Sequence, residues 1–144
     1  QHRELAHTTD DPFIEIKPGR YYGHPNPLRD EYVLNGGNPT DAVDAQEVAA
    51  YPVGTPPEPN WEAPVLSFGK NISPNGLLEL RGPAFGGRFA GAILVVRYSA
   101  GDDVLLLRTN ARGDVTDVVS NVTGLTGFTD PLDIAEDPRT GNLY

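Results

Sequence analysis

The chain has 144 residues, is acidic, and is rich in glycine and proline, with 16 and 14 of them respectively. Eleven Lys and Arg against 20 Asp and Glu give a formal net charge of -9, and such a surface repels nucleic acid and anionic lipid. No cysteine is present, which excludes disulfides and thiolate metal sites. The longest apolar run, residues 90–98, is far shorter than the ~18 residues of a membrane span. We therefore expect a β-rich chain with many turns and with neither nucleic acid nor a membrane as partner.

The first predicted strand covers residues 13–17, where apolar and charged residues alternate before a turn at Pro18 and Gly19. The segment that follows, residues 19–27, reads Gly-Arg-Tyr-Tyr-Gly-His-Pro-Asn-Pro. Its prolines and glycines fix the backbone at defined points around three rings. A stiff loop that presents aromatic and polar side chains is a good candidate for a binding site.

Residues 28–72 predict little regular structure. A short strand is expected at 31–34 and a helix at 41–50, which Thr40 or Asp41 caps and Pro52 stops. Residues 51–64 are proline-rich and predict an extended loop that Trp61 packs down, and residues 65–68 are expected to return to the sheet. Residues 20–70 are thus expected to form a loop excursion of ~50 residues, a length that is typical of a functional segment.

The remainder of the chain consists of short apolar runs separated by turn signals. The turns are predicted at 99–102, 110–113 and 137–141, where Gly, Asp and Pro gather. Apolar runs of strand length with such punctuation predict consecutive hairpins of an antiparallel sheet. The runs cover residues 76–80, 92–98, 104–109, 115–119, 132–136 and 142–144.

Two of these segments resemble each other, which predicts a repeat. The sequence of residues 74–80 followed by 91–94 resembles that of residues 131–137 followed by 141–144. Their separation is close to the ~40–50 residue period of β-propeller blades. The predicted fold class is therefore all-β, and we expect the chain to be a section of a longer propeller that ends within a blade.

The loop Tyr21-Tyr22-Gly23-His24-Pro25-Asn26, read with Ser73-Pro74-Asn75-Gly76 and the run at 91–96, resembles the soluble glucose dehydrogenase and sorbosone dehydrogenase family. The resemblance implies a six-bladed β-propeller, periplasmic or secreted, that oxidises a sugar or another small polyol with pyrroloquinoline quinone held together with calcium. Its implied organisation has the end of one blade at 1–19, a long loop insertion on the propeller face at 20–72, a complete four-stranded blade at 73–120 and a truncated start of the next blade at 121–144. The rest of the propeller, in the same or another chain, is then an expected partner.

The resemblance also implies which residues contact the cofactor. Tyr22 matches the tyrosine of the family's Tyr-Gly-Trp-Pro loop, which packs on the quinone, and His24 stands where tryptophan is expected. Asn26 and Arg29 lie beside them in the sequence, and Arg97 lies near the position of an expected lysine. The family's catalytic histidine belongs to an early blade outside this chain, so the sequence predicts no catalytic residue, and it predicts no metal ligand.

One departure from the family pattern leaves two functions open. Where quinone-binding members carry arginines, this chain has Thr129-Asp130-Pro131-Leu132, and a carboxylate there repels a tricarboxylate cofactor. The first hypothesis is a section of a quinone-dependent sugar dehydrogenase. The second is a propeller without catalysis that binds a carbohydrate or a protein partner through the loop at 20–70.

Overall fold

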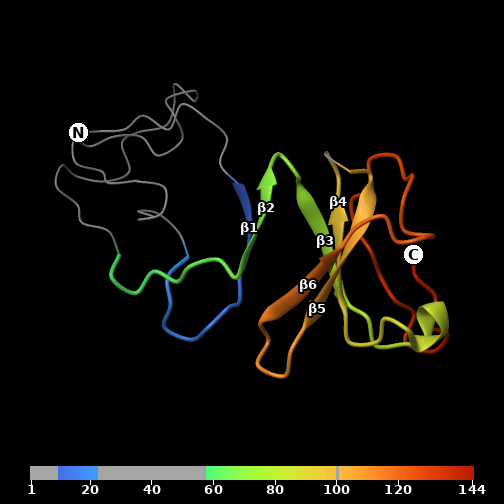
Figure 1. Ribbon diagram of the computed structural model, residues 1–144, viewed down its shortest axis with the longest axis horizontal. Coiled ribbons are helices and arrows are strands. Elements are labelled where there is room, and N and C mark those ends of the chain that lie inside the picture. Colours follow the sequence, from blue (N-terminus) through green and yellow to red (C-terminus); the bar gives the residue numbers. More distant parts are fainter. Residues whose placement is uncertain (1–9, 23–57, 100) are drawn as a thin grey trace. The chain divides into compact units, whose positions relative to one another are not determined.

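The computed structural model describes residues 10–22, 58–99 and 101–144 (Figure 1). The chain divides into two compact units, Gln1–Ser67 and Phe68–Tyr144. The described residues are mostly strand and turn, so the all-β prediction is confirmed. The elements are β1 (Asp10–Phe13), β2 (Leu66–Lys70), β3 (Pro74–Glu79), the short 3-10 helix η2 (Ala84–Gly87), β4 (Ile93–Arg97), β5 (Asp103–Thr109) and β6 (Val115–Val119). No helix within these ranges is long and apolar enough to cross a membrane.

Strands β1 and β2 form a two-stranded sheet, in which the Ser67 hydroxyl donates a hydrogen bond of 2.7 Å to Asp10 Oδ2. The predicted strand at 13–17 is wrong, because the strand ends at Phe13. From residue 14 the backbone leaves the ladder, and its polar groups at 15 and 17 bond to the side chain of Tyr22 instead. The turn at Pro18 and Gly19 and the return of the chain to a sheet near residue 66 are confirmed. The strand predicted at 31–34 and the helix predicted at 41–50 lie outside the described residues.

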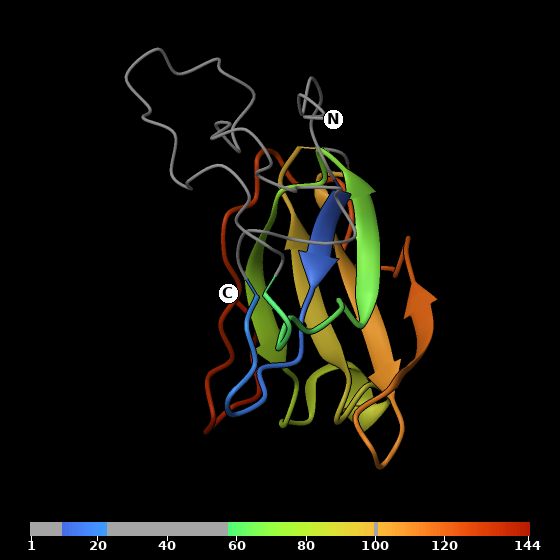
Figure 2. The same cartoon turned by 90° about the vertical axis from the view of Figure 1, so that its left-hand side faces the viewer.

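The second unit contains a four-stranded antiparallel sheet whose strand order, β3-β4-β5-β6, is also the order in the sequence. The four strands lie side by side in both views (Figure 1 and Figure 2). Strands β5 and β6 meet through the turn predicted at 110–113, which the Gly113 amide closes by donating to the Asn110 carbonyl over 3.0 Å. The four apolar runs between residues 76 and 119 are therefore confirmed as strands in the predicted order.

The two central strands are buried on both faces of this sheet. Leu94, Val96, Val104 and Leu106 belong to one hydrophobic cluster, which also takes in residues from the connections and the C-terminal segment. The intervening residues point to the opposite face, and Val95, Leu105 and Leu107 are only 1, 5 and 0% exposed. An antiparallel sheet with one solvated face would alternate between buried and exposed positions along each strand. The two central strands do not, whereas the edge strand β3 does and exposes Leu77, the register partner of Val95.

The chain after β6 packs along the face of the sheet that carries the hydrophobic cluster, through Val122, Leu125 and Ile134. Its backbone comes close to the sheet at Gly76 of β3, where a Cβ atom would lie 2.8 Å from the Asp133 Cα. The strands predicted at 132–136 and 142–144 are shorter than expected: they meet in a single bridge between Glu136 and Leu143. The turn predicted at 137–141 is confirmed. The division of the chain into blades stays a prediction.

Candidate functional site

A pocket of about 450 Å³ opens in the second unit, between the sheet and the C-terminal segment. Val96 of β4 and Val104 of β5 form its floor, and both are almost fully buried. Leu125 and Ile134, from the chain after β6, add further apolar wall. A concave and mainly apolar cavity of this size is typical of a small-molecule site. The other lining residues are Ala84, Phe85, Gly124, Phe128, Pro131, Asp133, Gly141, Asn142, Leu143 and Tyr144.

Three aromatic residues of this pocket are accessible to solvent. Phe85 comes from η2, Phe128 from the loop after β6, and Tyr144 from the end of the chain, with 38, 41 and 75% exposure. The face of an aromatic ring carries partial negative charge, so it attracts the C–H groups of a sugar ring as well as other apolar groups. The rings therefore offer stacking surfaces for a flat ligand.

Two polar side chains, Asp133 and Asn142, line the same pocket. The Asp133 Oδ1 atom accepts a hydrogen bond of 2.8 Å from the Ile134 amide, and no hydrogen bond from the described part of the chain reaches its other carboxylate oxygen. The side-chain amide of Asn142 likewise forms no hydrogen bond within the described ranges. A carboxylate that accepts and an amide that both donates and accepts suit the hydroxyl groups of a polyol.

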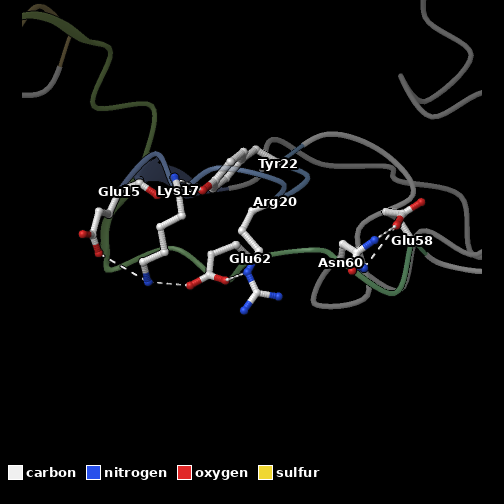
Figure 3. A network of polar contacts seen from close by, with 7 residues as sticks. All are labelled: Glu15, Lys17, Arg20, Tyr22, Glu58, Asn60 and Glu62. Carbon is white, nitrogen blue, oxygen red and sulfur yellow. Dashed lines mark hydrogen bonds and ion pairs between the residues drawn. The ribbon is translucent and has the colours of Figure 1, made fainter.

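Of the site residues predicted from the sequence, Tyr22 and Arg97 lie in the described ranges, in the first and the second unit respectively. His24, Asn26 and Arg29 lie outside them. The Tyr22 hydroxyl accepts a hydrogen bond of 2.6 Å from the Lys17 amide and donates one of 2.9 Å to the Glu15 carbonyl (Figure 3). This tyrosine therefore holds the turn at residues 15–22 in shape.

Arg97 is paired with a carboxylate of its own unit. Its Nε and Nη2 atoms donate to Asp103 Oδ1 and Oδ2 over 2.6 Å each, and the two side chains are only 19 and 4% exposed. These hydrogen bonds raise the pKa of Arg97 above its ordinary value. The two residues face each other in the β4–β5 register, so the pair fixes the end of that hairpin.

Arg97, which the family resemblance places near a quinone, does not fit that role. Its guanidinium is committed to Asp103, so it is not free to bind the carboxylates of the quinone. Within the described ranges, no three His, Cys, Asp or Glu side chains gather to hold a metal ion. We therefore derive no chemistry through a quinone or through calcium.

A network of exposed charges surrounds the turn that Tyr22 holds (Figure 3). The Lys17 Nζ atom lies 2.7 Å from Glu62 Oε1 and 3.3 Å from Glu15 Oε2. Arg20 Nε lies 3.1 Å from Glu62 Oε2. The hydrogen bond from Lys17 lowers the pKa of the Glu62 carboxyl, and the bonds to Glu62 and Glu15 raise the pKa of Lys17.

Replacing Lys17 by Met is expected to raise the pKa of Glu62 toward its ordinary value, because the main hydrogen bond to the carboxylate is lost. The measurement is an NMR titration of the Glu62 side-chain carbonyl, with Lys70→Met as a control of equal charge change. Since the folded-state pKa is lowered, the contribution of this carboxylate to stability is present above its unfolded pKa and disappears as the pH falls through its folded pKa. An unchanged Glu62 titration in Lys17→Met would contradict the pairing.

In comparisons with known proteins, no family model, no curated protein and no solved structure matches this chain. The sheet, the pocket and the sequence motifs are therefore what points to a function.

The sequence did not reveal the pocket as a site. Its exposed rings come from two separate connections and from the end of the chain, so no strand or helix period joins Phe85, Phe128 and Tyr144. One signal was available: the turn at 137–141 brings residues 133–136 back against 142–144, which places Asp133 and Asn142 on neighbouring segments of one hairpin.

Proposed function

We propose that this chain is a section of a β-propeller similar to the glucose and sorbosone dehydrogenases, and that it binds a sugar or another small polyol in the pocket of its second unit. The observation that carries the propeller proposal is the burial of β4 and β5 on both faces. A propeller blade is an antiparallel sheet in chain order that packs against a neighbour on each side. The sheet of the second unit has this strand order, and its two central strands are buried on both faces.

Binding is favoured over quinone-dependent oxidation by the chemistry of the candidate residues. The pocket offers exposed rings together with one Asp133 carboxylate oxygen and the Asn142 side-chain amide, neither of which is hydrogen-bonded to a described residue. This combination is suited to a neutral polyol. Its one charged side chain is a carboxylate, which disfavours an anionic cofactor. In this proposal the rest of the propeller, in the same or another chain, completes the blades on either side. The family resemblance supports a periplasmic or secreted location.

The test is a binding titration of the 144-residue chain with glucose and other monosaccharides, followed by NMR. We expect saturable shifts of the Phe85, Phe128 and Tyr144 ring signals. Phe128→Ala is expected to weaken binding about tenfold, because a lost stacking contact costs roughly 0.5–1.5 kcal/mol beyond the lost apolar area. Asp133→Asn is expected to weaken it by a similar factor, since a hydrogen bond to a charged group contributes about 1.5–3 kcal/mol.

The matched control is Val118→Ala, an exposed apolar residue of β6 that does not line the pocket. It is expected to leave sugar binding unchanged. If no sugar in the panel binds, or if Val118→Ala weakens binding as much as Phe128→Ala, polyol binding at this pocket is wrong.

The second candidate function is quinone-dependent oxidation of a sugar or alcohol, which the motif Tyr22-Gly23-His24-Pro25 favours. The assay adds pyrroloquinoline quinone and calcium to the complete propeller, because the family's catalytic histidine lies outside this chain, and follows the bleaching of an electron-acceptor dye with glucose. Bleaching above a quinone-only blank, with quinone retained after dialysis, would support this candidate. No bleaching and no retained quinone would eliminate it and leave the binding proposal standing. Binding of a protein partner without any sugar binding would favour a scaffold propeller.

A further inference from the structure

Two arginines differ from the others in the described part of the chain. Arg20, Arg81, Arg97, Arg112 and Arg139 each lie within 3.5 Å of a carboxylate. Arg88 and Arg108 have no carboxylate partner within the described ranges. In a chain with a net charge of -9, acidic groups are abundant, so two unpaired guanidinium groups need an explanation.

The two unpaired arginines meet at one aromatic ring. The Cζ atom of Arg88, which follows η2, lies 4.2 Å from the centroid of the Phe89 ring, and the Cζ atom of Arg108 on β5 lies 5.8 Å from it. Phe89 is only 6% exposed and belongs to the hydrophobic cluster. Its ring also contacts Phe85, with centroids 5.3 Å apart. Two exposed guanidinium groups from different elements therefore lie against the same buried ring.

The placement of these guanidinium groups suits an oxyanion. The attraction of a cation to a ring face positions a guanidinium without using its N–H groups as hydrogen-bond donors. Those donors form a planar fork that matches the oxygens of a phosphate or a carboxylate. A monocarboxylate has oxygens for one such fork, whereas a phosphate or sulfate group has enough for two.

An acidic residue, Asp117, lies next to one of these two arginines. Asp117 of β6 is the register partner of Arg108 across the β5–β6 ladder, yet no ion pair between their side chains is present. Residues directly opposite in an antiparallel pair are within reach of each other. Asp117 is therefore the group that competes with an external anion for Arg108.

We infer that Arg88 and Arg108, held on the ring of Phe89, bind the doubly charged oxyanion of a small ligand, either a phosphate or a sulfate group. A small ligand is favoured over a polyanion such as nucleic acid, because the net charge of the chain repels an extended negative charge. This inference is independent of the polyol pocket and of the propeller proposal.

The experiment is an NMR titration of the full chain with inorganic phosphate, sulfate and acetate at constant ionic strength, following the Arg Nε–H and Phe89 ring signals. Phosphate and sulfate are expected to give saturable shifts and to bind more tightly than acetate. Arg88→Gln and Arg108→Gln are each expected to weaken binding about tenfold or more, because each removes charge-assisted hydrogen bonds. Asp117→Asn is expected to strengthen it severalfold by removing the competing carboxylate.

Arg112→Gln is the matched control, since it makes the same change in net charge at an exposed arginine that is paired with Asp114. It is expected to change the affinity less than twofold. Circular dichroism spectra establish that every variant keeps its sheet. The inference is overturned if phosphate and sulfate give no saturable shift, if acetate binds as tightly as they do, or if Arg112→Gln weakens binding as much as Arg88→Gln.

Discussion

Replacing Asp103 by Ala is expected to lower the free energy of unfolding by about 3–5 kcal/mol, the usual cost of removing one partner of a buried ion pair. The carboxylate is 4% exposed and binds the guanidinium of Arg97 through both oxygens. Without it, the Arg97 guanidinium, itself 19% exposed, has no counter-charge among the described residues. Urea denaturation of the 144-residue chain, followed by far-UV circular dichroism, gives the measurement.

The control for this prediction is Glu79→Ala, which removes an ion pair with Arg81 whose side chains are 79 and 52% exposed. Exposed pairs contribute about 0–1 kcal/mol, so this variant should unfold almost as the unchanged protein does. The double variant Arg97→Met with Asp103→Leu should recover much of the loss, because apolar side chains can replace a buried pair. If Asp103→Ala and Glu79→Ala cost the same, the pair does not stabilise the hairpin end.

Replacing Leu106 by Ala is expected to lower the free energy of unfolding by about 2–5 kcal/mol, because the cavity left in the core adds to the lost burial. Leu106 lies in β5 and is 0% exposed within the main cluster. Leu107, which follows it, is also 0% exposed but points to the opposite face. Leu107→Ala should therefore cost a similar amount, and the measurement is again urea denaturation.

The exposed Leu77 of β3, at 58% exposure, provides the same substitution outside the core. Leu77→Ala is expected to cost well under 1 kcal/mol, as surface substitutions usually do. A small cost for Leu106→Ala would contradict the packed core. If Leu106→Ala lowers the free energy of unfolding strongly and Leu107→Ala lowers it little, only one face of the sheet is packed. The blade proposal would then be wrong.

The sheet of the second unit was predictable because local signals agree there. Each apolar run has strand length, and Gly, Asn and Asp mark the turns that join them. The strand that the sequence predicts at 13–17 is absent, and its absence could not be predicted in the same way. Its alternation of apolar and charged residues is real, but the backbone of Glu15 and Lys17 bonds to the Tyr22 hydroxyl, a tertiary contact that no sequence period reveals.

The candidate site was also predictable only in part. Arg97 was expected near a cofactor, yet it faces Asp103 directly across the hairpin, a pairing that the predicted turn and register could have indicated. The pocket could not be predicted, because its rings lie in connections whose course depends on the packing of the whole unit. The proposed oxyanion site at Arg88 and Arg108 could not be predicted from the sequence either, because the two arginines are brought together only by their contacts with the buried Phe89 ring.

The order of the four strands has a consequence for how this unit forms. Every strand pairs with the next one along the chain, and contacts between residues close in sequence require little loop-closure entropy and favour rapid folding. The approach of Asp133 to Gly76 joins distant positions instead. We therefore expect the hairpins to assemble first, and the closing segment, with the walls of the pocket that it supplies, to dock onto them afterwards.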